Sequence, residues 1–234
     1  MANIIKNGGI LKNYSFEKKF DELPLTIPLF PLKNCLLLPN SSLPLNLFEN
    51  RYLHMFDYSL LKDRIIGIIQ PLEDNLSEKE KQPTIYPIGC AGQIIAFNQT
   101  SDNRYEIVLK GISRFSVNKE LDLVNGFRVA EIKWDKYSKD LEQSKLTVLD
   151  KRLKFEEKLK LYLKKINIKA DWHAIEASND EDLLNSISMG CPFTSIEKQA
   201  LLEAHTIEDR LEVLTSLLEM SISENKSFQS KSLS

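Results

Sequence analysis

The sequence predicts an α+β fold in which a strand-rich part is followed by a helical part. From Leu23 to Trp134, short apolar runs of strand type are separated by Gly, Pro, Asn or Asp residues. After Trp134 the apolar residues recur every three to four positions, which is the period of an amphipathic helix. This change of period marks a change of architecture. We therefore expect a sheet-forming region over 23–137 and a helical bundle over 138–220.

The two ends of the chain differ from this body in composition. Residues 1–22 are rich in Lys and Asn without clear periodicity, and residues 221–234 contain six serines and few apolar side chains. Such segments bury too little apolar surface to offset the entropy lost on ordering. We expect a mobile N-terminal segment and a disordered C-terminal tail.

The strand-type runs predict one sheet with a helix inserted in it. The helix is expected over about Glu49–Leu61, where Tyr52, Phe56 and Leu60 recur at helical spacing. The runs are LPLTIPLFPL from Leu23, LPLNLF from Leu43, IIGIIQP from Ile65, IGCAGQIIAF from Ile88, RYEIVLKGISRFSV from Arg104 and FRVAEIKW from Phe127.

The first strand carries two prolines, Pro28 and Pro31, and is apolar on both faces. Because proline has no N–H to donate to a ladder, we expect this strand at an edge or seam of the sheet. An apolar edge of this kind can accept an extended peptide as an added strand. The candidate partner-binding residues are Phe30, Leu36, Leu38 and Phe48, with a structural alternative in which all four lie in the core under the helices.

Four helices are predicted in the second part. A long amphipathic helix covers about Gln143–Ile166, because apolar residues form one broad stripe there and lysines fill the rest. Thr194 with Glu197 matches a capping box. Shorter helices are expected over about Asp180–Met189, Ser195–Ala204 and Ile207–Met220.

Charge divides within the helical part. Lys145–Lys169 holds nine basic residues against three acidic ones, whereas Asp171–Glu219 holds eleven acidic against two basic ones. Two readings follow: the long helix lies against its own acidic neighbours, or its basic face binds nucleic acid or anionic lipid.

Composition and motifs exclude several classes of function. A net charge of −2 gives no global attraction to nucleic acid or to an acidic membrane. Cys35, Cys90 and Cys191 show no CxxC spacing, which argues against a disulfide framework or zinc site and favours the cytoplasm. No apolar run approaches the length of a membrane span. The P-loop, G-x-G-x-x-G and G-x-S-x-G motifs are absent, so we expect neither cofactor nor metal.

Several short motifs are similar to the Lon protease N-terminal domain, the substrate-binding domain family, in its stand-alone bacterial form. The shared elements are P-L-F-P-L at Pro28–Leu32, L-L-P at Leu37–Pro39, L-P-L at Leu43–Leu45, F-E-x-R-Y at Phe48–Tyr52, I-I-G-I-I-Q-P at Ile65–Pro71, I-G-C-A-G-Q-I at Ile88–Ile94 and G-I-S-R-F at Gly111–Phe115. We interpret their members as structural: Pro28, Pro31, Pro39, Pro44, Glu49, Arg51, Tyr52, Gly67, Gly89, Gly111, Arg114 and Phe115.

The resemblance implies a PUA-like six-stranded β-barrel followed by a helical bundle. It also implies a role in binding unfolded or tagged protein segments, or a separate protease. The chain lacks the P-loop and the P-K-D-G-P-S-A-G serine segment of full-length Lon proteases, so it is not expected to be an enzyme. Two alternatives remain: an RNA-binding module that uses Lys145–Lys169, and a hydrolase whose nucleophile is assembled only by folding.

Overall fold

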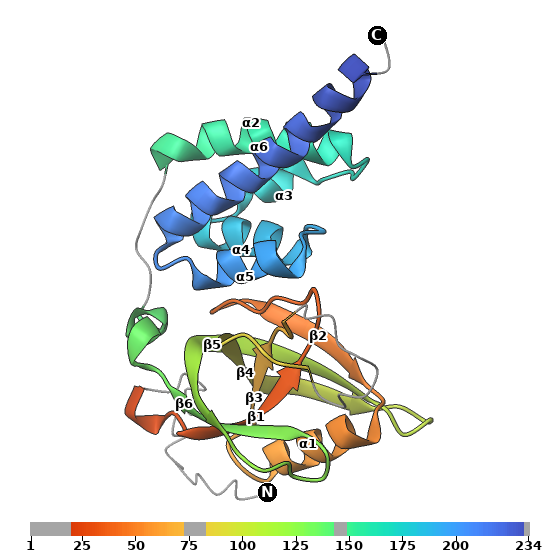
Figure 1. Cartoon of the computed structure of the whole chain (residues 1–234), viewed down its shortest axis with the longest axis vertical. Coiled ribbons are helices and arrows are strands. Elements are labelled where there is room, and N and C mark those ends of the chain that lie inside the picture. The colour runs from red at the N-terminus through yellow and green to blue at the C-terminus, as the bar shows by residue number, and fades with distance from the viewer. Residues whose placement is uncertain (1–19, 73–82, 143–148, 232–234) are drawn as a thin grey trace, which may run out of the picture.

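The computed structural model describes residues 20–72, 83–142 and 149–231, and it confirms the α+β architecture. Most of the predicted N-terminal segment, residues 1–19, lies outside the described residues. The strand-rich part lies below the helical part in Figure 1. Its elements are η1 (Phe20–Glu22), β1 (Thr26–Pro31), β2 (Ser42–Leu47), α1 (Asn50–Leu60), β3 (Ile65–Ile69), β4 (Ile88–Gln99), β5 (Tyr105–Glu120), β6 (Arg128–Lys133) and η2 (Asp135–Leu141).

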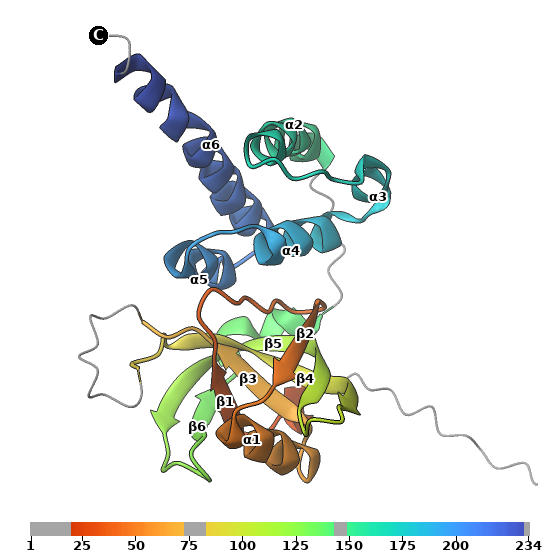
Figure 2. The same cartoon turned by 90° about the vertical axis from the view of Figure 1, so that its right-hand side faces the viewer.

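The six strands form one mixed sheet that curls into a ring. Their order is β2-β5-β4-β3-β1-β6, and an additional pairing of β5 with β6 closes the ring. The first half of β5 pairs with β2, whereas its second half pairs with β6 from Ser116 onward. Strand β2 therefore lies outside the closure, and the sheet is barrel-like without being a complete six-stranded barrel (Figure 2).

The sequence predicts the first strand at an edge or seam of the sheet; the edge position is wrong, and the pairing explains why its prolines are tolerated. Strand β1 lies between β6 and β3. It pairs with β6 over Thr26–Leu29 and with β3 over Leu29–Pro31, so the two registers overlap only at Leu29. Among the described strands, Pro28 is therefore paired with β6 alone and Pro31 with β3 alone. Because these strands make no ladder bond on the other side of either residue, the missing proline N–H costs no hydrogen bond there.

Two hydrophobic clusters cover the two faces of the sheet, which explains the apolar residues on both faces of β1. Ile27 and Leu29 join a cluster around Phe115, whereas Phe30 joins the larger cluster that extends to α1 and the helical part. The Phe115 ring lies so close to Gly67 and Gly89 that a Cβ there would meet it at 2.8 and 2.6 Å. The two glycines therefore make room for this ring.

The helical part contains α2 (Leu149–Lys165), α3 (Trp172–Ala177), α4 (Asp180–Gly190), α5 (Ser195–Glu203) and α6 (Ile207–Lys231). Helices α4 and α5 lie next to the sheet, and α2 and α6 lie above them (Figure 1). The predicted capping box of Thr194 and Glu197 is confirmed at the start of α5. Helix α6 continues to Lys231, past the expected end at Met220, so most of the segment expected to be a tail is helical; residues 232–234 lie outside the described residues.

A buried ion pair joins the sheet to the helical part. Arg114 of β5 bonds to Asp140 of η2 through Nε and Nη2, at 2.9 and 2.7 Å, and both side chains are almost fully buried. The same guanidinium donates to the carbonyl oxygens of Leu202, at 3.0 Å, and of Ala204, where α5 ends. The Arg114 guanidinium therefore supplies donors to acceptor oxygens of η2 and of the end of α5. Without it, these oxygens would be buried without hydrogen bonds.

Other polar contacts extend this joint between the two parts. Gln70 donates to the carbonyl oxygen of Ser195 at 3.0 Å, and Gln199 donates to that of Ile88 at 3.2 Å. Asn185 of α4 donates to the carbonyl oxygen of Pro39 at 3.1 Å. The helices are thus fixed on the sheet by directional hydrogen bonds as well as by apolar packing.

Replacing Arg114 with methionine is expected to destabilise the fold by about 3–5 kcal/mol, because Asp140 would remain buried without its cation. Urea denaturation followed by circular dichroism measures this loss. The matched control is Arg104→Met, since Arg104 pairs with Asp102 at 2.8 Å but both side chains are about half exposed. The control should cost at most about 1 kcal/mol. Equal losses in the two variants would contradict the central role of Arg114.

Candidate protein-binding surface

The structure separates the four residues predicted to bind a partner. Phe30, Leu36 and Leu38 are at most 5% exposed, whereas Phe48 is 62% exposed. The first three are buried because the chain after β1 runs beneath the helical part, where Lys198 of α5 donates to the carbonyl oxygen of Asn34 at 3.0 Å. Burial removes these three from a binding surface and leaves them in the core.

Most residues of the shared motifs hold the sheet and α1 in place. Glu49 is the N-cap residue of α1 and pairs with Arg51 at 2.7 Å. Tyr52 packs against Phe30 with ring centroids 4.2 Å apart. Gly111 faces the carbonyl oxygen of Leu38 so closely that a Cβ would overlap it. These contacts are internal to the fold.

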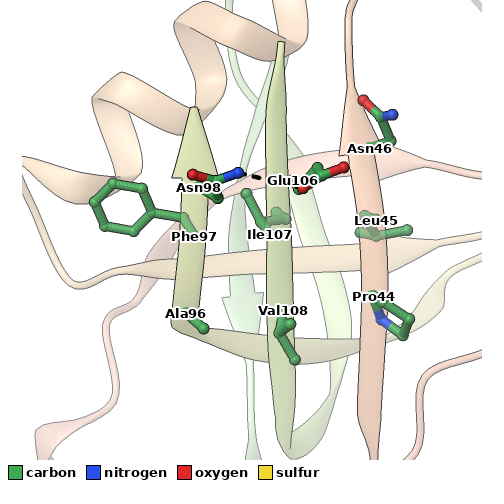
Figure 3. A pocket seen from close by; sticks show the side chains of 9 residues that line it. All are labelled: Pro44, Leu45, Asn46, Ala96, Phe97, Asn98, Glu106, Ile107 and Val108. Carbon is green, nitrogen blue, oxygen red and sulfur yellow. Dashed lines mark hydrogen bonds between the residues drawn. The ribbon is translucent and has the colours of Figure 1, made fainter. Parts of the chain in front are cut away.

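Three strand segments extend beyond the closed ring and form what we call the arm: Ser42–Leu47 of β2, Ile95–Gln99 of β4 and Tyr105–Lys110 of β5. One face of the arm bears a hollow of about 550 Å³, drawn in Figure 3. In register across the strands, Pro44, Val108 and Ala96 form an apolar row. The next row on the same face is polar: Asn46, Glu106 and Asn98.

Exposed apolar side chains lie on the arm and directly next to it. Ile95 and Phe97 of the arm are 52% and 54% exposed, and Phe48 follows β2 directly. Phe97 points sideways from β4 in Figure 3, and its ring meets that of Phe56 of α1 edge-on, with centroids 5.3 Å apart. Three large apolar groups therefore face solvent at one end of the molecule.

Sequence reasoning missed Ile95 and Phe97 because it assigned them to an ordinary strand. The register between β4 and β5 shifts between Ile94 and Ala96, so Ile95 is the extra residue of a bulge. The doubled isoleucine breaks the alternation of the strand, and this was the available signal. At a bulge, the side chain no longer follows the alternation between the two faces of the strand, so the residue is not buried as the regular pattern would require.

The basic helix α2 lies along the acidic helix α6, as one of the two readings of the charge pattern expected. Lys151 pairs with Glu212 at 2.9 Å, and Lys158 pairs with Glu219. Arg152 pairs with Glu156 and with Asp180 at the start of α4. Several cations of the basic stretch are thus already matched within the protein, which lowers their availability to an external polyanion.

The three cysteines are free thiols with little nucleophilic character. Cys90 and Cys191 are buried and Cys35 is partly buried. Burial raises the pKa of all three, to about 11 for Cys191. Because the thiolate is the reactive form, these thiols are protonated and unreactive near neutral pH.

A ring-shaped mixed sheet, an inserted helix and a helical region fixed on the sheet define an α+β domain of the kind found at the N-terminus of Lon proteases. The chain belongs to the family of the ATP-dependent protease La (LON) substrate-binding domain, whose model matches residues 26–220. Within the described residues, no helix combines the length and apolar character needed to cross a membrane.

Curated relatives are Lon proteases, and the chain spans about a quarter of their length. The Lon protease of Buchnera aphidicola (subsp. Acyrthosiphon pisum) is 25% identical over 199 residues, which are 85% of this chain and 25% of that protein. The Lon protease of Flavobacterium johnsoniae is 23% identical over 197 residues, 83% of this chain and 24% of that protein.

Solved structures show the same fold. A Lon N-terminal domain protein from Xanthomonas campestris superposes with a TM-score of 0.57 at 21% identity, covering 82% of this chain and 97% of that one. The N-terminal domain of a Mycobacterium avium complex Lon protease gives a TM-score of 0.59 at 16% identity, covering 83% and 98%.

Gly111→Ala is expected to destabilise the protein by about 3 kcal/mol, because the new methyl group would overlap the Leu38 backbone. Gly190→Ala is the matched control, since beyond its own helix backbone and chain neighbours no atom of the described residues lies within 4 Å of a Cβ at that position. The control should leave the stability unchanged or raise it by at most about 1 kcal/mol. Thermal unfolding of both variants measures the difference. A Gly111→Ala variant as stable as the wild type would rule out the close approach.

Alkaline pH is expected to destabilise the fold through Cys191. Burial raises the pKa of this thiol from 9.0 to about 11, so the native state keeps a proton that the unfolded chain releases. Such a group contributes stability below its unfolded pKa and loses it as the pH rises through the native pKa. The free energy of unfolding in urea should fall more steeply between pH 9 and 11 for the wild type than for Cys191→Ala. Parallel pH profiles would contradict this expectation.

Proposed function

We propose that the chain is a non-enzymatic protein-recognition module that binds extended apolar segments of non-native proteins on the arm. The observation that carries this proposal is that Phe48, Ile95 and Phe97, all more than half exposed, lie on or directly next to the strands that bear the hollow. Exposed apolar groups gathered at one site mark interaction surfaces, whereas single ones do not. The family's description as a substrate-binding domain supports a protein as the partner.

The arm suits weak, unselective capture. Covering three half-exposed side chains contributes roughly 1 kcal/mol each, which gives transient binding on its own. Around the hollow, polar groups such as Asn46 and Asn98 can bond to a passing backbone without demanding a particular side chain. An unfolded or tagged segment, presented alone or with a separate protease, is the partner that these properties fit. An adaptor of this kind would work in the cytoplasm, where free thiols persist.

Ile95→Glu is expected to weaken binding of a fluorescein-labelled peptide that alternates leucine and serine by about fivefold, because it replaces an exposed apolar side chain of the arm with a charge. Fluorescence anisotropy measures the affinity. Ile196→Glu is the matched control: Ile196 is also an isoleucine, 63% exposed, but it lies on α5 away from the arm.

Both variants should keep the circular dichroism spectrum of the wild type, since neither side chain is buried. Equal binding by the two variants would show that the arm is not the binding surface. Loss of binding at high salt alone would instead point to charged groups such as those of α2.

A further inference from the structure

Strand β4 is longer than the neighbour that covers its outer side. Its pairing with β3 ends at Gln93, opposite Ile65, and a last bond joins the Ile94 N–H to the carbonyl oxygen of Arg64 at 2.8 Å. Arg64 has the left-handed backbone angle φ of 57°, which turns the preceding chain away from the sheet toward α1. Strand β3 therefore does not extend alongside Ile95–Gln99, and it does not pair with the outer edge of that segment.

The residues of this segment are exposed, and in the described structure a strand is paired with it on one side only. Every residue from Ile95 to Gln99 is exposed, and in the described part of the chain the segment pairs only with β5. Leu61, at the end of α1, is highly exposed and lies three residues before Arg64, so an apolar group also stands close to the start of this edge.

The hydrogen-bond pattern identifies which backbone groups face outward. The Thr100 N–H donates to the carbonyl oxygen of Arg104 at 3.0 Å, so this pair bonds across the hairpin. Bonded and non-bonded pairs alternate in an antiparallel ladder. Asn98 and Ala96 therefore bond to β5, and the N–H and C=O groups of Phe97 and Gln99 point to the outer side.

The opposite edge of the arm is protected. Pro44 lies opposite Val108, and because proline has no N–H it fits only where that group would face away from β5. Its presence removes a donor from the outer edge of β2, which is a common way to block strand pairing. By the same alternation, the N–H and C=O groups of Val108 bond to Ala96 and not to Pro44. The pattern deduced from Thr100 gives the same result. The outer edge of β2 therefore lacks a donor at its centre, whereas the outer edge of β4 keeps the donors of both Phe97 and Gln99.

We propose that the outer edge of β4 over Ile95–Gln99 accepts an extended peptide segment as an added strand, bonded to the backbone of Phe97 and Gln99. The proposal rests on the proposed function and specifies how the partner is held. Backbone bonds supply affinity that is independent of sequence, and the exposed side chains of Ile95 and Phe97 favour apolar residues in the added strand.

The size of the edge selects a peptide over a second copy of the chain. Five residues of strand span about 16 Å. Edge-to-edge pairing over that length falls well short of the roughly 1,200 Å² that stable interfaces between folded proteins bury. An extended segment is not restricted in this way, because it can follow the edge and also reach the hollow on the adjacent face.

The test compares Gln99→Pro with Gln99→Ala, using the same leucine–serine peptide. Proline removes an outward N–H without breaking the ladder to β5, whereas alanine keeps that N–H. We expect affinity to fall about tenfold in Gln99→Pro and to stay within about twofold of the wild type in Gln99→Ala. In the wild type, peptide binding should slow hydrogen exchange of the Phe97 and Gln99 amides and leave that of Asn98 unchanged, because Asn98 is already bonded.

The outcomes separate this proposal from the one on which it rests. Suppose that Ile95→Glu weakens binding, that Gln99→Pro binds as well as Gln99→Ala, and that peptide leaves hydrogen exchange of the Phe97 and Gln99 amides as unchanged as that of Asn98. The arm then binds through side chains and the added strand is wrong. If the wild type binds no peptide, both proposals fail. If the wild type sediments as a dimer that Gln99→Pro dissociates, a second copy occupies the edge and the inference is overturned. Should Gln99→Pro fail to fold, amide exchange in the wild type decides alone.

Discussion

The rest of the structure depends on one buried guanidinium. Arg114 stands on the longest strand, is neutralised by Asp140 on the connection that leaves the sheet, and satisfies carbonyl oxygens at the turn between α5 and α6. Desolvating a charge is costly, so such a group is tolerated only when its geometry is fully satisfied. The requirement fixes the direction in which the chain leaves the sheet and the position at which the helices return to it.

The helices cover one end of the sheet and not the other. The segment after β1 is covered by α4 and α5, and its apolar residues become core. The arm extends beyond the closure of the ring and receives no such cover. The same strand, β5, serves both ends because its two halves pair with different partners. An exposed surface for protein recognition and a rigid support for it therefore come from a single piece of secondary structure.

Much of this fold is readable from the sequence, and the failures have physical causes. Runs of strand type and the period of 3.6 located the strands and the helices apart from the short α3, and the capping residues located the start of α5, because these signals are local. The position of β1 was not predictable, and the sequence left open whether Phe30, Leu36 and Leu38 bind a partner or lie in the core, since both depend on which distant segments cover each face. Phe48 was found as a candidate, whereas Ile95 and Phe97 required knowledge of a register shift that only the partner strand defines.

Strand β5 also links the arm to the helical part. It carries the arm at one end, and a few residues further along it holds Arg114 against the turn between α5 and α6. Between these two places, over 111–115, the described residues pair β5 with β4 alone. Only this short stretch of strand separates the arm from the base of α6, the helix that projects farthest from the body (Figure 2).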